Sequence, residues 1–142
     1  MPPPLHRRRR TASLVAMPWP QIAVISLGAS IGAVLRWQSG VWLNDRWHGF
    51  PLGTLFVNCV GGLLVGVALA WFERTPDELL RLLLVTGLLG GFTTFSAFSV
   101  ESLVLLQRGE WALALGHTLA HVVGALASAA IGFRLAALLL AR

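Results

Sequence analysis

Residues 87–99 read GLLGGFTTFSAFS, a stretch rich in glycine and hydroxyl side chains in the middle of an otherwise apolar segment. A membrane-spanning helix keeps its backbone hydrogen bonds unbroken, because lipid supplies no water to a free N–H or C=O group. Irregular backbone at that depth is tolerated only where protein buries it or where it lines an aqueous path. The stretch therefore predicts a broken helix that serves ions or polar solutes rather than simple anchorage.

The composition is that of a small integral membrane protein. The 142 residues are 56% hydrophobic and 12% charged, with a mean hydropathy of +0.72, whereas soluble domains carry about 25% charged residues. The formal charge is +5, yet the chain has no lysine, which excludes a P-loop and Schiff-base chemistry. The basic excess lies in one block, Arg7–Arg10, and at the edges of apolar segments, a distribution that does not indicate nucleic-acid binding.

Four apolar segments each reach the roughly 20 residues that a spanning helix needs. They cover about residues 20–43, 51–72, 79–106 and 111–139. Thr75 is the expected N-cap of the third segment, with Pro76 at the first helical position. Because the connections are short, we expect neighbouring antiparallel helices in one all-α transmembrane domain, residues 17–142. Five tryptophans lie near segment ends, where interfacial belts form: Trp37, Trp42, Trp47, Trp71 and Trp111.

Arginine positions predict the orientation. With four spans, the N-terminus, the turn at 73–81 and the C-terminus share one side of the membrane. That side carries most of the arginines: Arg7, Arg8, Arg9, Arg10, Arg74, Arg81, Arg134 and Arg142. The other side carries Arg36, Arg46 and Arg108. The positive-inside rule therefore places both termini in the cytoplasm.

The N-terminal residues 1–16 are rich in proline and arginine and are expected to form a disordered basic extension rather than a signal peptide. Met17 is an alternative start. A chain that begins there has almost no arginine bias, as expected of a protein that inserts in both orientations. Mass spectrometry of the native protein tests this hypothesis, and a mature chain that begins before Arg7 contradicts it.

Small residues recur at helical spacing. Gly28 and Gly32 form one GxxxG pattern, and Gly62 and Gly66 form another. The fourth segment has a small residue at every fourth position: Gly116, Ala120, Gly124, Ser128 and Gly132. Such stripes let helix backbones approach closely in lipid. Because four helices enclose little interior, we expect much of this packing to lie between subunits.

Polar and aromatic side chains mark a path through the second and third segments. Thr54 and Asn58 stand four residues apart and share one helical face. An asparagine amide at membrane depth is costly without partners, so Asn58 indicates an interhelical hydrogen bond or a polar path. Phe95 and Phe98 leave one side of their helix, and aromatic rings carry a positive edge that favours an anion without formal charge. Hydroxyl donors accompany them: Thr93, Thr94, Ser96 and Ser99.

His117 and His121 stand four residues apart in the fourth segment. HxxxH is a usable metal pair, but two ligands make no complete site and no carboxylate lies nearby in the sequence. We therefore expect these histidines to line a pore or to bond between helices. Glu101 is expected to pair or cap near the membrane interface, with Arg36 or Arg108 as its partner. A serine–histidine hydrolase is a further alternative, but the chain has no GxSxG motif.

Three motifs resemble those of the CrcB/Fluc family of fluoride channels: GASIGAVLRW at 28–37, PLGTLFVNCVGGLLVG at 51–66 and GLLGGFTTFSAFSVE at 87–101. The likeness covers about residues 22–135. It implies a fluoride-selective channel, not an enzyme, that forms an antiparallel dual-topology homodimer in the bacterial inner membrane. Fluoride would leave the cytoplasm passively, driven by the membrane potential.

The resemblance also implies roles for individual residues. Asn58 matches the pore asparagine, and Phe95 and Phe98 match the paired pore phenylalanines. Three hydroxyl residues would lie on or near the polar track: Thr54, Thr94 and Ser96. Gly90 and Thr93 match the segment whose backbone carbonyls hold a structural sodium ion at the dimer interface. Arg36 matches an arginine at the end of the first helix, where it would concentrate anions near a vestibule.

The fourth segment departs from the family pattern, because His117 and His121 stand where a tyrosine and a serine are usual. Both still donate hydrogen bonds in a pore. Histidine changes charge near neutral pH, so we expect a pH-dependent conductance, which an unchanged pH profile in a Tyr/Ser double variant would refute. Two other functions stay open: a small exporter, for which only Glu101 offers the embedded carboxylate, and a membrane subunit without transport activity.

Overall fold

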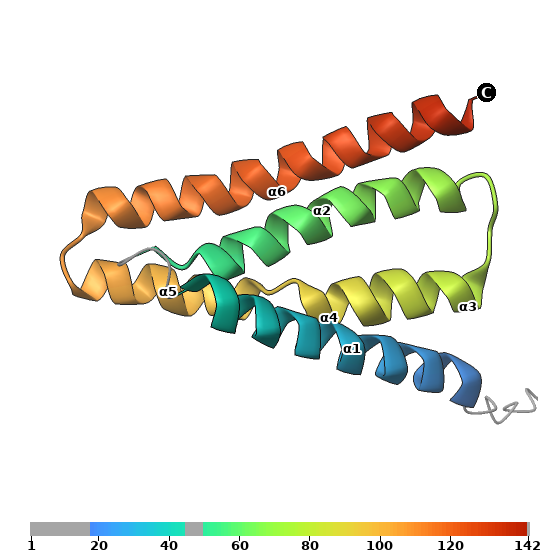
Figure 1. Cartoon of the computed structure of the whole chain (residues 1–142), viewed down its shortest axis with the longest axis horizontal. Coiled ribbons are helices and arrows are strands. Elements are labelled where there is room, and N and C mark those ends of the chain that lie inside the picture. The colour runs from blue at the N-terminus through green and yellow to red at the C-terminus, as the bar shows by residue number, and fades with distance from the viewer. Residues whose placement is uncertain (1–17, 45–49, 142) are drawn as a thin grey trace, which may run out of the picture.

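The computed structural model describes residues 18–44 and 50–141, and all regular structure in these ranges is helical (Figure 1). Four helical spans are long and apolar enough to cross a membrane: α1 (Trp19–Leu43), α2 (Leu52–Phe72), a broken third span (Glu78–Gln107) and α6 (Trp111–Leu140). They confirm the four predicted spans to within one residue at each end. The predicted extension 1–16, Met17, Arg46 and Trp47 lie outside the described residues.

The third span consists of four consecutive pieces: α3 (Glu78–Arg81), the π-helical segment η2 (Leu82–Leu89), α4 (Gly90–Phe92) and α5 (Phe95–Gln107). Its N-cap is Asp77. The expected N-cap, Thr75, is therefore wrong. The Asp77 carboxylate accepts a hydrogen bond from Leu80 N at 2.9 Å, and its extended backbone suits a capping position. Pro76 therefore precedes the helix.

The break in the third span lies at Thr93 and Thr94, in the middle of the segment 87–99 that the sequence singled out. Both residues are extended, with ψ of 160° and 124°, whereas Gly90 is helical. Thr94 restarts the helix as the N-cap of α5, because its Oγ1 accepts a hydrogen bond from Ala97 N at 3.1 Å. The third span is therefore broken within the predicted glycine–threonine stretch, and its irregular residues are the two threonines, whereas Gly90 is helical.

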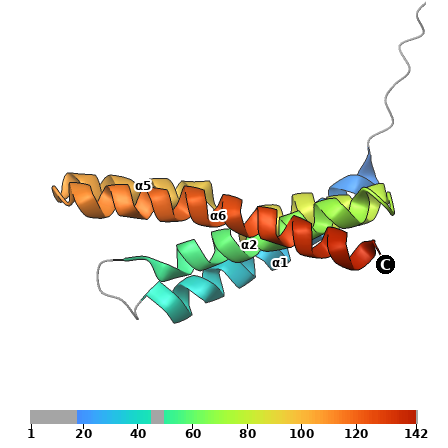
Figure 2. The same ribbon diagram turned by 90° about the horizontal axis from the view of Figure 1, so that it is seen from above.

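The helices form two neighbouring pairs. α2 lies between α6 and the third span, and α1 packs along the third span (Figure 1). Seen from above, α5 and α6 run together and diverge from the ends of α1 and α2 near residues 44 and 52 (Figure 2). The start of α1 and the end of α6 lie at the same end of the bundle, as four spans require (Figure 1).

Glycines allow α1 to approach the third span closely. A Cβ on Gly28 would lie 2.7 Å from Leu88 N, and a Cβ on Gly32 would lie 2.7 Å from Phe92 N. Real Cβ atoms do not come this close to backbone nitrogen, so no larger residue fits at either position. The predicted GxxxG packing of the first helix is confirmed as a contact within the chain.

Glycines also join α2 to α6. A Cβ on Gly62 would lie 2.6 Å from Ala125 O, and one on Gly66 would lie 2.7 Å from Phe133 N. These contacts lie within one chain, so the glycines of α2 are not free for the packing between subunits that we expected of them. Gly116 differs from them, because an added Cβ there would have no atom within 4 Å.

Candidate functional site

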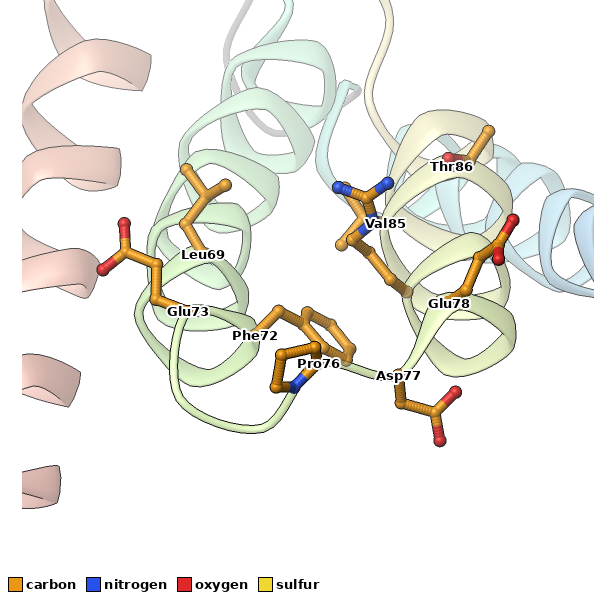
Figure 3. Close-up of a pocket in the computed structure, with 9 residues that line it drawn as sticks. Leu69, Phe72, Glu73, Pro76, Asp77, Glu78, Val85 and Thr86 are labelled. Carbon is orange, nitrogen blue, oxygen red and sulfur yellow. The ribbon is translucent and has the colours of Figure 1, made fainter.

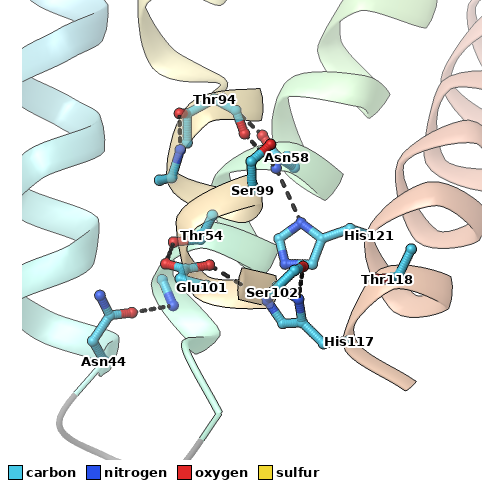
Figure 4. Close-up of polar contacts among 12 residues, drawn as sticks. Asn44, Thr54, Asn58, Thr94, Ser99, Glu101, Ser102, His117, Thr118 and His121 are labelled. Atoms are coloured by element: carbon cyan, nitrogen blue, oxygen red, sulfur yellow. Dashed lines mark hydrogen bonds and ion pairs between the residues drawn. The ribbon is translucent and has the colours of Figure 1, made fainter. Parts of the chain in front are cut away.

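Polar side chains from α2, α5 and α6 meet beside the break in the third span (Figure 4). Asn58 on α2 is locked to Thr94 by two hydrogen bonds. Asn58 Nδ2 donates to Thr94 O at 3.0 Å, and Thr94 N donates to Asn58 Oδ1 at 2.9 Å. A side-chain amide offers the donor and acceptor of a peptide group, so Asn58 satisfies backbone groups that the break would leave unpaired. The expected interhelical hydrogen bond of Asn58 is confirmed.

The same contacts free two backbone carbonyls at mid-span. In a continuous helix Thr94 N would donate to Gly90 O, and Ala97 N would donate to Thr93 O. In this structure Thr94 N donates to Asn58 Oδ1, and Ala97 N donates to Thr94 Oγ1. Gly90 and Thr93 are the two residues for which the family resemblance implies contact with a structural sodium ion. Their carbonyls have therefore lost the amide donors that a continuous helix would give them.

His117 and His121 lie on the face of α6 that meets α2 and α5, and they are 0% and 4% exposed. His121 Nδ1 is 3.1 Å from Asn58 Nδ2, and His117 Nδ1 is 3.0 Å from Ser102 Oγ. The ring of Phe98 packs on both, with centroid distances of 5.5 Å to His117 and 4.9 Å to His121. The predicted interhelical bonding of the two histidines is thus confirmed.

Glu101 on α5 reaches the same cluster, and the expected partnership with an arginine is wrong. Glu101 Oε1 accepts from Thr54 Oγ1 at 2.5 Å, and Oε2 lies 3.4 Å from His117 Nε2 (Figure 4). No ion pair joins Glu101 to an arginine among residues 18–44 and 50–141. The sequence did carry a signal, because Glu101 and Ser102 follow Phe98 by three and four residues and so share its helical face.

Arg36 lines a cleft of about 290 Å³ that also reaches Thr54 and Glu101. The Arg36 Nε donates to Gly91 O at 3.0 Å, so the backbone beside the break holds the guanidinium in place. A positive charge at the side of a cleft that reaches Thr54 and Glu101 is what the vestibule prediction requires. The role of Arg36 itself stays a prediction.

A second cavity, of about 490 Å³, is lined by Asn58, Phe95, Phe98 and His121. The two phenylalanine rings are 5.3 Å apart, but Phe98 is 9% exposed and Phe95 is 78% exposed. Ser96 is also exposed, and its Oγ lies 3.2 Å from Thr94 Oγ1. The structure therefore gathers the predicted pore residues around the break and leaves Phe95 and Ser96 at an open rim.

A further cleft, of about 620 Å³, lies at the turn between α2 and α3 (Figure 3). Its apolar wall includes Leu69 and Phe72, and its polar lining consists mainly of the charged side chains at the two helix ends: Glu73, Asp77, Glu78 and Arg81. None of the predicted site residues lines this cleft. The polar cluster at the break is therefore the candidate site.

The family model described as "CrcB-like protein, Camphor Resistance (CrcB)" matches residues 23–133. The chain belongs to this family. Two curated relatives of this CrcB-like chain carry the name "Fluoride-specific ion channel FluC". The protein of Marinobacter nauticus is 48% identical over 119 residues, which cover 81% of this chain and 93% of the relative. The protein of Aromatoleum aromaticum is 48% identical over 116 residues, which cover 80% and 88%.

A third relative with that name, from Pseudomonas aeruginosa, is 45% identical over 116 residues, which cover 80% of the CrcB-like chain and 91% of the relative. These matches confirm the resemblance that the three motifs indicated. Together with the four apolar helices, they show a multi-pass bacterial membrane protein of the CrcB-like family.

Proposed function

We propose that the chain is a fluoride-selective ion channel and not an enzyme. The names of its relatives support this function. The observation that carries it is the buried polar cluster at the break, where Asn58 hydrogen-bonds to both Thr94 and His121 between apolar helices. Polar groups at membrane depth are costly, and they mark ion pathways when they line a cavity.

Neutral donors suit a small and strongly hydrated anion. A pore has to replace the water of the ion with closely placed donors, yet it must bind the ion weakly enough to release it. Asn58 Nδ2 and Thr54 Oγ1 are such donors, and both hydrogen-bond to other protein groups in this structure. An entering anion exchanges places with these partners, which keeps each binding step weak. Phe98 adds a ring edge, and Arg36 would raise the anion concentration at a vestibule.

The assembly that we propose is an antiparallel dual-topology homodimer. One chain leaves the cavity beside Phe95 open, and the ring of Phe95 is 78% exposed. Gly90, whose carbonyl the break frees, is also exposed. Free backbone groups do not face lipid in the hydrocarbon region. A second copy of the chain would cover this face and complete the cavity.

A structural sodium ion is proposed at the centre of the dimer. The carbonyls of Gly90 and Thr93 are oxygen ligands, which hard cations prefer, and their helical donors bond elsewhere. Two oxygens are fewer than such a cation takes, so the ion would need the same pair from the partner copy. When bound, it supplies a positive charge that compensates the carbonyl dipoles of both breaks.

Transport would be passive and electrogenic, across the bacterial inner membrane. A membrane potential that is negative inside drives an anion outward by about 2.3 kcal/mol per 100 mV. No ATP or second protein is needed. Such a channel lowers cytoplasmic fluoride.

Fluoride efflux from proteoliposomes tests the proposal. Purified protein is reconstituted with potassium fluoride inside, valinomycin releases the membrane potential, and a fluoride electrode follows the efflux. We expect rapid fluoride release, with little release from matched chloride-loaded vesicles. A correctly folded protein that releases no fluoride contradicts the channel function.

A proton-coupled exporter is the second candidate, because Glu101 is a carboxylate inside a span and faces His117 at 3.4 Å. Proton coupling makes transport depend on a pH gradient, whereas a channel responds only to the electrochemical gradient of fluoride. Efflux that follows valinomycin at equal pH on both sides favours the channel. Transport that requires a pH gradient and is lost in Glu101→Gln favours the exporter.

A further inference from the structure

Three metal-ligating atoms of the polar cluster converge without hydrogen-bond partners. They are Glu101 Oε2, His117 Nε2 and His121 Nε2, and all three are shielded from solvent. Each of the three residues offers one ligand atom that lies within 4.8 Å of the other two, and the two histidines are 0% and 4% exposed. Buried polar atoms without partners are rare, because they lose hydration and gain nothing in return. Glu101 Oε2 and His117 Nε2 face each other at 3.4 Å without a hydrogen bond, and His121 adds a third ligand atom within 4.8 Å, so the cluster indicates a shared ligand.

We infer that Glu101, His117 and His121 form a binding site for a divalent transition metal ion such as Zn²⁺ or Co²⁺, and that the bound ion closes the path for anions. The binding part of this inference is independent of transport. The closing part rests on the proposed channel function, since it concerns the path beside Thr54 and Asn58.

The donor atoms favour this class of ion. Two imidazole nitrogens and one carboxylate oxygen are a donor set of open zinc sites, in which water or another small ligand takes a fourth position. Mg²⁺ and Ca²⁺ prefer oxygen ligands throughout. The distance of 3.4 Å between Glu101 Oε2 and His117 Nε2 agrees with the roughly 3.3–3.6 Å between two ligands of a tetrahedral ion with bonds of about 2.0–2.2 Å. His121 supplies the third ligand atom, which lies within 4.8 Å of the other two.

Neighbouring side chains orient two of the ligands from behind. Thr54 Oγ1 donates to Glu101 Oε1 at 2.5 Å, and Ser102 Oγ lies 3.0 Å from His117 Nδ1 (Figure 4). Such outer contacts fix the orientation of a metal ligand and the ring nitrogen that faces the metal. Glu101 Oε2 and His117 Nε2 are the atoms that they leave for coordination.

His121 connects the metal site to the break. Asn58 Nδ2 donates to Thr94 O and lies 3.1 Å from His121 Nδ1. Since Nδ2 has only hydrogens to offer, His121 Nδ1 is the acceptor, and the ring proton is on Nε2. A metal needs the lone pair of Nε2, so on binding the proton moves to Nδ1 and meets the Asn58 donor. Asn58 and His121 then separate, and the bound ion disturbs the two hydrogen bonds between Asn58 and Thr94 at the break.

The cleft beside Arg36 reaches the proposed metal site, because Thr54 and Glu101 line it. Arg36 carries the positive charge that faces the cleft, and this charge lowers the local concentration of cations. We therefore expect weaker binding than in closed structural zinc sites, in which four protein ligands surround the ion.

Cobalt absorption tests the binding part directly. The full-length protein is purified without a polyhistidine tag and titrated with Co²⁺, whose tetrahedral complexes absorb strongly in the visible range. We expect saturation at one Co²⁺ per chain and loss of the absorption when Zn²⁺ is added. His121→Ser and Glu101→Gln should each weaken binding at least tenfold. The variant that lacks the other two histidines of the sequence, His6→Ala/His48→Ala, should bind like the wild type.

The inference is overturned if wild-type protein gives no saturable tetrahedral Co²⁺ spectrum, or if the spectrum survives in the double variant His117→Tyr/His121→Ser. That variant carries the residues usual in the family, and gel filtration checks that it is folded. The closing part is tested in proteoliposomes, where Zn²⁺ should slow fluoride efflux through the wild type and not through the double variant. Equal efflux with and without Zn²⁺ at saturating occupancy refutes closure. A protein that binds Co²⁺ but never releases fluoride refutes the channel function and leaves the metal site supported.

Discussion

The two halves of the third span differ in what they contact. Upstream of Thr93, η2 and α4 pack against α1 through glycines, with backbone touching backbone. Downstream of Thr94, α5 presents Phe98 and Glu101 to the polar side chains of α2 and α6. The upstream contacts leave no room for adjustment, whereas each downstream contact depends on particular polar atoms. The third span thus has a tightly packed half upstream of the break and a half with a polar face downstream of it.

The largest effect is expected in the tightly packed half, for Gly32→Leu. The added side chain collides with the backbone of Leu88 and Phe92, which cannot move without separating α1 from the third span. Overpacking costs about 1–3 kcal/mol and occasionally more, and a collision with backbone atoms belongs at the upper end of that range, so we expect little folded protein. Membrane yield and the unfolding free energy in a detergent titration measure it. A variant with normal yield and wild-type stability would show that the close approach of the two helices is not needed.

Asn58→Leu removes both hydrogen bonds between Asn58 and Thr94 at the break. It leaves Thr94 N and Thr94 O without their partners, and each buried unsatisfied group costs about 1–3 kcal/mol. We expect a loss of about 3 kcal/mol in unfolding free energy and a fall of fluoride efflux to the level of empty vesicles. Phe56→Leu, on the exposed side of the same helix, is the control. If Asn58→Leu conducts at the wild-type rate, the lock plays no part in the path.

Thr54→Val tests a polar contact of the downstream half, the hydrogen bond from Thr54 on α2 to Glu101 on α5, with almost no change in side-chain volume. It removes the hydrogen bond to the Glu101 carboxylate, and hydrogen bonds to charged groups contribute about 1.5–3 kcal/mol. Because Glu101 is partly exposed, we expect about 1 kcal/mol in stability, and about a tenfold slower efflux. Thr54→Ser keeps the hydroxyl and should restore the rate. Equal rates for valine and serine variants would remove Thr54 from the path.

The smallest effect is expected for Gly116→Ala, since an added Cβ has no neighbour within 4 Å in one chain. Alanine is the better helix former, so the unfolding free energy should change by less than about 1 kcal/mol. Comparison of the Gly32 and Gly116 variants separates the effect of close helix packing from the effect of replacing a glycine. A loss of dimer in gel filtration would instead place Gly116 in the interface between subunits.

The spans could be predicted from sequence because their lengths and hydropathy follow from the thickness of the bilayer. Asn58 and the histidines also stood out, since polar groups within spans are rare. The exact residues of the break within the stretch 87–99 could not be predicted in the same way. Glycine favours irregular backbone in isolation, but here Gly91 packs against Ala29, and the helix opens where Asn58 offers replacement hydrogen bonds.

Glu101 was misjudged for a related reason. Its place near the end of a span indicated an arginine partner at the membrane surface. Its partners come instead from helices that the sequence does not order in space: Thr54 from α2 and His117 from α6. Only its spacing from Phe98 could have placed it on the polar face.

The lock between Asn58 and Thr94 also bears on how the chain enters the membrane. Asn58 precedes Thr94 by 36 residues and His121 by 63 residues. A chain is made from its N-terminus, so α2 is already synthesised when the break emerges from the ribosome. We therefore expect the irregular segment to pair with Asn58 as soon as it enters the membrane. A circular permutant that begins with the third span would reverse that order. The broken helix would then reach lipid before Asn58, which pairs with its backbone.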